Sequence, residues 1–381
     1  MINQLNIKNK SKIILKFIII LFFLWFITLQ IVAFVSINFT DLEQPHSWPK
    51  KPLETYLYWA RWDSKWYSSI STDGYYLQNG NSNVTFFPLY PSLMKISNII
   101  FNVDLMWAGF LISIISIILS LYYLYRLILI DFDKSHAKKS LVYLLFLPAA
   151  FFLISTYAES LFLLEIILSF YFARNKKWLI ASIFALLAGI TRIPGTLLFP
   201  VLIIEYLSQN QYKLKNIRIN FIYLFSIPLG LASLMFYYWY KFNDALIFLH
   251  NQTTYLRHFT WPHNVIKGYL NTIFINPNNV ASDLYLILLI DLTILILYFI
   301  ILIISFKKLR LSYSIFLLLN LLILIFTGTF SGMSRYILPL FPAVIVLGFI
   351  NNKFIRSSIL IVLGITQIYL IARFVNWYWV G

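Results

Sequence analysis

Long apolar runs constrain this chain more than any other feature. The sequence contains eleven hydrophobic segments that few charged residues interrupt. A helix of about 20 apolar residues crosses the hydrocarbon core of a membrane. The pattern therefore predicts an all-α bundle of about eleven transmembrane segments, formed by residues 1–381 as a single domain. The approximate spans are 17–39, 105–130, 141–156, 160–173, 178–191, 195–207, 220–240, 283–305, 311–327, 337–350 and 357–375.

The composition agrees with a membrane protein. Charged residues make up 12% of the chain, whereas a soluble domain carries about 25%. The chain has no cysteine, which excludes disulfides, thiol catalysis and cysteine-based metal sites. We expect a multi-pass integral membrane protein, and the richness in Ile, Asn and Lys favours a prokaryotic cell membrane.

The four segments between residues 141 and 207 are too short to cross a membrane comfortably. They are expected to form two hairpins, 141–173 and 178–207, whose tips stop inside the membrane depth. Irregular backbone at that depth is tolerated only where it is buried in protein or lines a wet cavity. The tips are therefore candidates for a functional site.

The basic residues predict the orientation of the bundle. The net charge is +16, and 19 of the 30 Lys and Arg residues fall in short loops on the side of the N-terminus. Cytoplasmic loops carry such an excess, so we expect the N-terminus inside and the C-terminus outside. Topology then accounts for most of the basic charge, and no nucleic-acid partner is expected. The two long aromatic loops, 40–104 and 241–282, would lie outside, and they point to external chemistry.

The first long loop carries an aspartate among aromatic residues. If residues 58–67 form an interfacial helix, Asp63 shares a face with Trp59 and Trp66. A carboxylate on an aromatic face is costly without a function or a partner. The alternatives are a helix cap, or an ion pair with Lys65 or a distant arginine. A second interfacial helix is expected over residues 91–101, and Gly74 is expected in a turn.

Charged residues also mark three predicted external tips. Glu159 begins one apolar run, where it could act as a helix cap instead of a site residue. Arg192 and Arg335 each precede a short apolar segment, and an arginine there is more favourably placed in a protein cavity than in lipid. Because the guanidinium group binds phosphate with paired hydrogen bonds, both arginines are candidate anion ligands.

Other polar residues leave more than one interpretation open. The second long loop holds His250, His258 and His263, whose spacing fits no common zinc motif, so a substrate loop is favoured over a metal site. Glu165 and Asp291 lie inside predicted spans. They could serve a pore or ion coupling, or they could form hydrogen bonds between helices.

Five short blocks, taken in order, resemble the PIG-V family of integral-membrane mannosyltransferases, which belongs to the GT-C superfamily. Each block is short, but together they cover most of the chain. They are Arg61-Trp62-Asp63 through Trp66, Ile70 and Gly74-Tyr75; Phe86 to Pro91; Pro148 to Phe152 with Tyr157 to Phe162; Thr191-Arg192 with Gly195; and Ser334-Arg335-Tyr336 with Phe341-Pro342.

The resemblance implies a GT-C-like fold and transfer of mannose from a polyprenyl-phosphate donor to a glycolipid or glycan on the outer face. Its catalytic acid matches Asp63, the candidate general base. The sequence departs from the family pattern at Gln78, where a glutamate is usual, and at Arg61, where a histidine is usual. The candidate phosphate ligands are Arg192, Arg335, Lys65 and Arg257, and the candidate substrate contacts are Arg61, Trp62, Trp66, Tyr67, Tyr75, Glu159 and Tyr336.

No metal or other cofactor is expected beyond the lipid-linked donor. Two alternatives remain open at the level of sequence. One is a lipid or sugar transporter that uses Glu165 and Asp291 as coupling groups. The other is a different branch of the same superfamily, with another sugar or a protein acceptor.

Overall fold

The structure is a computed structural model that describes residues 2–39, 54–78, 81–255, 257–275 and 282–380. Nearly all of the described elements are helices. The two strands among them, β1 (Leu77–Gln78) and β2 (Asn81–Ser82), form a short antiparallel pair in which Leu77 faces Ser82. The prediction of an all-α fold is confirmed.

Five regions are helical, long and apolar enough to cross a membrane, judged by length and composition: Ile13–Phe39, Leu105–Ile128, Ile219–Phe242, Leu284–Lys308 and Lys353–Val375. They belong to α1 (Ile2–Phe39), α4 (Leu105–Ile128), α9 (Ser226–Phe242) with the turn before it, α12 (Ser282–Lys308) and α16 (Lys353–Val375). The count of eleven crossings and the orientation stay predictions.

Shorter helices fill the space between the long ones. They are α2 (Ser64–Asp73), α3 (Leu89–Phe101), α5 (Lys134–Phe146), α6 (Glu159–Arg174), α7 (Trp178–Thr191), α8 (Leu198–Gln209), α10 (Ile247–His250), α11 (Pro262–Leu270), α13 (Leu311–Ile325), α14 (Met333–Tyr336) and α15 (Phe341–Leu347). The 3₁₀ turns are η1 (Thr55–Trp59), η2 (Ala150–Leu153), η3 (Ile193–Leu197), η4 (Leu214–Asn216), η5 (Ile219–Phe225) and η6 (Asn251–Tyr255), and η7 (Asn271–Ile275) is a π-helical turn.

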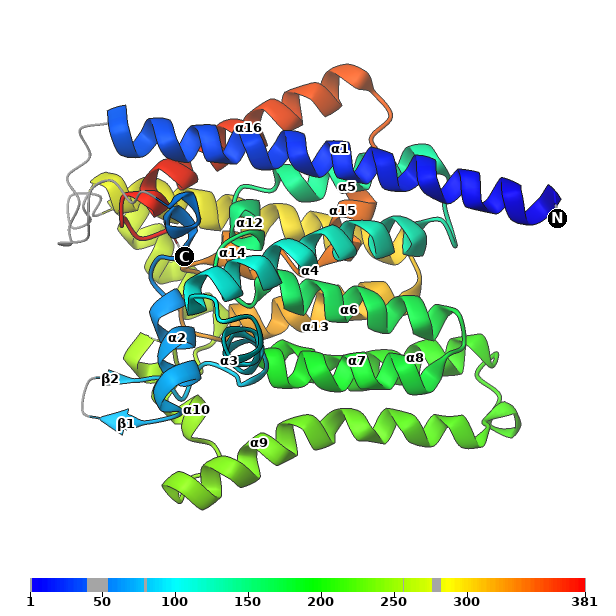
Figure 1. Cartoon of the computed structure of the whole chain (residues 1–381), viewed down its shortest axis with the longest axis horizontal. Helices are drawn as coiled ribbons and strands as arrows, with labels where there is room; N and C mark the ends of the chain where they lie inside the picture. The colour runs from blue at the N-terminus through cyan, green and yellow to red at the C-terminus, as the bar shows by residue number, and fades with distance from the viewer. Residues whose placement is uncertain (1, 40–53, 79–80, 256, 276–281, 381) are drawn as a thin grey trace.

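Most of the helices run along one common direction (Figure 1). The helices α2, α3, α10 and α14, the two strands and the C-terminus gather at one end of the bundle, and the N-terminus lies at the other. The first predicted external loop, 40–104, includes residues 40–53 and 79–80, which lie outside the described part of the chain. The second, 241–282, includes residues 256 and 276–281, which also lie outside it.

Every predicted apolar segment overlaps a helix, but two details differ from the prediction. The segment 141–156 is not one helix, because α5 ends at Phe146 and Leu147 adopts an extended conformation before Pro148. A residue that precedes proline is pushed out of the helical region. The chain then continues through η2 and a turn to Glu159, so the hairpin tip is irregular and buried.

The predicted single helix over residues 58–67 is also wrong. The stretch divides into η1 and α2, and Trp62 between them has a φ of 46°. This left-handed backbone interrupts the helical path. Trp59 packs in the core and donates a hydrogen bond to Gln30 (3.1 Å), whereas Asp63 is partly exposed. The predicted turn at Gly74 is confirmed by its φ of 74° at the end of α2.

Close contacts at two glycines allow the irregular segments near residues 156 and 192 to pack against neighbouring helices. A Cβ atom on Gly195 would lie 2.2 Å from the backbone of Ala188, so the turn η3 can lie against α7 only with glycine there. On α4, Gly109 approaches Thr156 so closely that an added Cβ would lie 2.5 Å from its side chain. These contacts bring the two irregular tips, around residues 156 and 192, against the bundle.

Candidate active site

One contact between predicted site residues joins the first loop to the last tip. Asp63 precedes the first residue of α2, and Arg335 lies in α14. The Nη1 atom of Arg335 donates a hydrogen bond to Oδ2 of Asp63 at 2.6 Å. The Asp63 side chain makes no capping hydrogen bond among the described residues. Of the alternatives for Asp63, the ion pair with a distant arginine is therefore the observed one.

Glu159 lies at the centre of the same cluster. It is the first residue of α6, and its side chain is fully buried. Its Oε1 atom accepts hydrogen bonds from Nε of Arg335 and from Nη1 of Arg192. Its Oε2 atom is also buried and has no hydrogen-bond partner among the residues that the structure describes. The two carboxylates and two arginines form what we call the ion-pair cluster, which consists of Asp63, Glu159, Arg192 and Arg335.

Burial and charge act in opposite directions on Arg335. Burial alone would lower the pKa of its guanidinium group, but Glu159 and Asp63 outweigh burial and raise that pKa well above its usual value. The guanidinium carbon lies 4.5 Å from the ring centroid of Tyr157 and 5.2 Å from that of Phe152. The aromatic rings and the carboxylates together fix the side chain, which is only 5% exposed.

Tyr157 connects the cluster to the turn before α2. Its hydroxyl accepts a hydrogen bond from the backbone N–H of Asp63 and donates one to the carbonyl of Arg61, each at 3.1 Å. Burial raises the pKa of this hydroxyl well above its usual value, which keeps it a donor. The ring also meets Tyr67 edge-on, with 6.3 Å between the centroids. Tyr157 thus holds the backbone on which Asp63 is carried.

The turn that presents Arg335 is anchored by a buried acid on α12. The carboxylate of Asp291 accepts hydrogen bonds from the N–H groups of Gly332 (3.1 Å) and Ser334 (3.3 Å). Gly332 has a φ of 78°, a conformation that favours glycine. On the other side of the turn, Trp379 donates a hydrogen bond to the Ser331 hydroxyl at 3.2 Å. Asp291 therefore fills one of the roles that the sequence left open, a hydrogen bond between elements.

Three guanidinium groups converge on one aromatic ring. The carbon atoms of Arg257, Arg192 and Arg335 lie 4.5, 5.3 and 5.9 Å from the centroid of Tyr336. Arg257 also donates a hydrogen bond to the carbonyl of Ser331 at 2.9 Å. No carboxylate lies within salt-bridge distance of Arg257 in the described part of the chain. The site therefore has two matched ion pairs and an additional cation beside them.

The remaining candidate residues of the first loop differ in how exposed their side chains are. Tyr67 and Tyr75 are buried, and Tyr75 donates a hydrogen bond to the carbonyl of Phe86 at 2.7 Å. Trp66 is half-buried and stacks on Phe86 at 6.1 Å. Lys65 is exposed, and its Nζ atom lies 4.5 Å from the centroid of the Trp66 ring. Trp66 and Lys65 are the more accessible of these four side chains.

Arg61 and Trp62 contact the C-terminal end of the chain. Arg61 donates a hydrogen bond to the carbonyl of Val375 at 3.2 Å, and its guanidinium carbon lies 4.9 Å from the centroid of Trp377. Burial lowers the pKa of Arg61 to about 10. The Trp62 ring meets Trp377 and Trp379 at 5.9 and 5.7 Å. This geometry favours a structural role for Arg61.

Apart from Asp291, the residues that the sequence analysis considered for a metal site or a pore make no contact with the ion-pair cluster among those described here. His250 pairs with Asp244 at 2.7 Å on the surface. Within the described ranges, no group of three or more His, Asp or Glu side chains could hold a metal ion. Glu165 is buried on α6 beside Thr191.

The contacts of two site residues were not predicted from the sequence. Tyr157 lies in a quoted block, but nothing in the sequence shows that its hydroxyl reaches the backbone of Asp63. Asp291 was identified as an intramembrane acid with two possible roles, and the backbone N–H groups that it binds leave no sequence signal that would choose between them.

Comparisons with known proteins give limited information. No protein-family model matches the sequence, and no curated protein matches it. Among solved structures, the chain is similar to an oligosaccharyltransferase from Archaeoglobus fulgidus in complex with Zn and sulfate, with a TM-score of 0.49 and 14% identity over 93% of this chain and 53% of that one. A second structure of that enzyme, tethered through a disulfide bond to an acceptor peptide containing the NVT sequon, has a TM-score of 0.40 and 14% identity over 94% and 55%. The chain spans about half the length of the solved chains it matches.

Proposed function

We propose that this chain is an integral-membrane glycosyltransferase that transfers a hexose, mannose by its resemblance to the PIG-V family, from a polyprenyl-phosphate sugar to a hydroxyl of a glycolipid or glycan. One observation carries the proposal. Asp63, which the resemblance makes the catalytic acid, lies 2.6 Å from Arg335 in a cluster that also contains Glu159 and Arg192. The acid that would accept a proton and the cations that would bind a phosphate are thus neighbours.

In the proposed reaction, Asp63 takes the proton of the acceptor hydroxyl as that oxygen attacks the anomeric carbon. The bond between the anomeric carbon and the phosphate oxygen breaks, and its electron pair leaves with the lipid phosphate. Negative charge therefore develops on the phosphate, where arginines stabilise it most effectively. Attack opposite to the leaving group inverts the anomeric centre.

The contacts support different roles for the three arginines. Arg335 lies between two carboxylates, so its first role in the proposal is to orient Asp63. Arg192 has a 15% exposed side chain, and Arg257 has no carboxylate within salt-bridge distance among the described residues. These two arginines are the better candidates for the donor phosphate. A bound phosphate would also compete for Arg335 and so make Asp63 a stronger base.

A charge-neutral substitution tests the assignment of the base. We expect Asp63→Asn to lower kcat by about 10² to 10⁴, the range typical of a lost general base. The matched control is Asp73→Asn, which removes the same charge from the exposed, opposite end of α2 and should change kcat less than twofold. Transfer is measured with polyprenyl-phosphate mannose and lipid extract by the mass of the product.

Two results would contradict the proposal. Full activity of the Asp63→Asn variant rules out the assignment of Asp63 as the base. Failure of the unmodified protein to transfer a hexose from any polyprenyl-phosphate sugar rules out the enzyme itself. If a protein without transferase activity moved a lipid or sugar across the membrane of liposomes, that result would instead support a transporter.

A further inference from the structure

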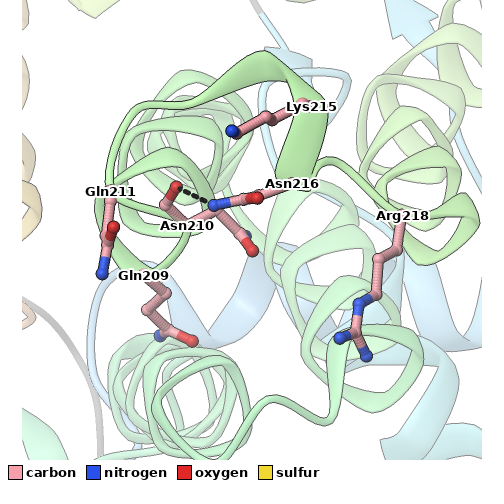
Figure 2. Close-up of a pocket in the computed structure, with 6 residues that line it drawn as sticks. All are labelled: Gln209, Asn210, Gln211, Lys215, Asn216 and Arg218. Atoms are coloured by element: carbon pink, nitrogen blue, oxygen red, sulfur yellow. Dashed lines mark hydrogen bonds between the residues drawn. The ribbon is translucent and has the colours of Figure 1, made fainter.

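A second polar site lies at the end of the bundle opposite the ion-pair cluster. The loop between α8 and α9 encloses a hollow of about 390 Å³. Its lining is amide or basic throughout, with no acidic side chain. Figure 2 shows the six side chains around the hollow. They are Gln209, Asn210, Gln211, Lys215, Asn216 and Arg218.

Hydrogen bonds hold this loop in one shape. The Asn216 side chain donates to the carbonyl of Asn210 at 3.1 Å, as drawn in Figure 2. The hydroxyl of Tyr206 accepts from the N–H of Arg218 at 3.0 Å and donates to the Asn220 side chain at 2.7 Å. These bonds fix the backbone and the side chains around the hollow.

The positive charge at the hollow has no local counter-charge. The sequence contains no Asp or Glu from residue 206 to residue 243. The acid just before that stretch, Glu205, is fully buried and already bound by Arg310 (3.1 Å) and the Ser312 hydroxyl (2.6 Å). Lys215 and Arg218 are exposed, and neither has a carboxylate within salt-bridge distance in the described part of the chain. An anion is the complementary ligand.

Gln209 contributes an amide whose orientation is fixed. Its Nε2 atom donates to the carbonyl of Ala173 (3.0 Å) and to Oε1 of Glu205 (2.8 Å). These bonds hold the side chain against α6 and α8. The lining therefore combines the cations of Lys215 and Arg218 with amides that are held in place, and this combination suits a phosphate group.

Exposed apolar side chains on the loop indicate how deep in the membrane the hollow lies. Leu214 and Ile219 are 78% and 84% exposed, and Ile222 follows on the next turn at 59%. Such side chains are stable in lipid, and basic residues beside them lie at the level of the phosphates. We propose that the hollow binds the head group of an anionic membrane phospholipid, in the leaflet opposite the ion-pair cluster.

The test compares two variants that lose the same charge. Lys215→Gln/Arg218→Gln removes the cations of the hollow, and Lys353→Gln/Arg356→Gln removes two from the first turn of α16, in another basic loop predicted on the same side. The full chain is purified in detergent and titrated with mixed micelles that contain phosphatidylglycerol or phosphatidylcholine. Native mass spectrometry then counts the bound lipids.

We expect the unmodified protein and the α16 variant to retain phosphatidylglycerol in preference to phosphatidylcholine. The hollow variant should bind phosphatidylglycerol about 25-fold more weakly, about fivefold for each lost cation. Equal losses in both variants, or a loss in neither, would overturn the proposal. Soluble glycerol phosphate distinguishes the source of the phosphate, since binding as tight as that of the lipid would overturn a lipid ligand. None of these readouts depends on glycosyl transfer.

Discussion

The ion-pair cluster depends most on Glu159, because one of its oxygen atoms accepts hydrogen bonds from two guanidinium groups. Arg192 and Arg335 both donate to Oε1. The side chain has no access to solvent that could replace these contacts. Asp63 contacts Arg335 alone in the cluster and is 16% exposed. Glu159 is therefore a buried structural acid, whereas Asp63 is accessible to a substrate.

This difference predicts that substitution of Glu159 lowers stability much more than substitution of Asp63. Glu159→Gln leaves two arginines without their shared counter-charge, and breaking a buried ion pair in this way costs about 3–5 kcal/mol. We expect the variant to unfold at a clearly lower temperature in detergent. Asp63→Asn should unfold within a few degrees of the unmodified protein. A Glu159→Gln variant as stable as Asp73→Asn would contradict this view of the cluster.

A second prediction concerns Arg257, and this prediction rests on the proposed function. A hydrogen bond to a charged group contributes about 1.5–3 kcal/mol. Arg257→Gln should therefore raise KM for the lipid-phosphate donor by roughly tenfold or more and change kcat less.

Arg335→Lys should mainly lower kcat, because a single ammonium group cannot bridge Asp63 and Glu159 as the guanidinium does. Equal effects of both variants on KM would argue against this division of roles.

At the scale of elements, the short helix α14 is placed by its neighbours rather than by its own length. Four residues cannot form a stable helix alone. Asp291 on α12, Arg257 before α11 and Trp379 near the C-terminus each bind the turn from Ser331 to Ser334. The position of Arg335 therefore depends on three distant segments.

Asp291→Asn should loosen this turn without disturbing the rest of α12. An amide can accept from the backbone with one oxygen, so one of the two hydrogen bonds is lost. We expect faster hydrogen exchange at the N–H groups of Gly332 and Ser334, together with a lower kcat. The control is Ser305→Ala on the same helix, where a buried hydroxyl that bonds within its own helix is removed. Unchanged exchange at the turn in Asp291→Asn would refute the anchoring role.

The sequence located the helices and the members of the ion-pair cluster for clear physical reasons. Apolar runs form helices in lipid, and charged residues at their tips need partners, which drew attention to Asp63, Glu159, Arg192 and Arg335. The pairing could not be predicted, because these four residues come from four separate elements and more than one arrangement satisfies their charges.

Backbone detail was also beyond the reach of the sequence. The break at Trp62 was missed because tryptophan rarely adopts a positive φ. The aromatic and acidic pattern around it is equally compatible with one continuous helix. Tertiary contacts to Trp377, Trp379 and Tyr157 stabilise the break.

For the whole molecule, the two polar sites occupy opposite ends of the bundle (Figure 1). The ion-pair cluster lies near α2 and α14, and the hollow lies between α8 and α9. If the distribution of basic residues sets the orientation, these ends face opposite sides of the membrane. Thr72 and Lys215 are exposed reporters of the two ends.

The absence of cysteine makes this orientation directly measurable. Each variant, Thr72→Cys or Lys215→Cys, carries a single thiol. A membrane-impermeant maleimide should label Thr72→Cys in intact cells, and Lys215→Cys only after the membrane is permeabilised. The reverse pattern would invert the predicted topology, and labelling of both in intact cells would show that the ends are not separated by the membrane.

The pairing of Asp63 with Arg335 also sets the order in which the site can form during synthesis. The ribosome makes Arg335 272 residues after Asp63, when most of the bundle has already been inserted. Until then, Glu159 and Arg192 have only each other, and the first loop has no cation to hold its acid. A chain released before α14 would thus carry the Asp63 carboxylate without its arginine partner at this end of the bundle.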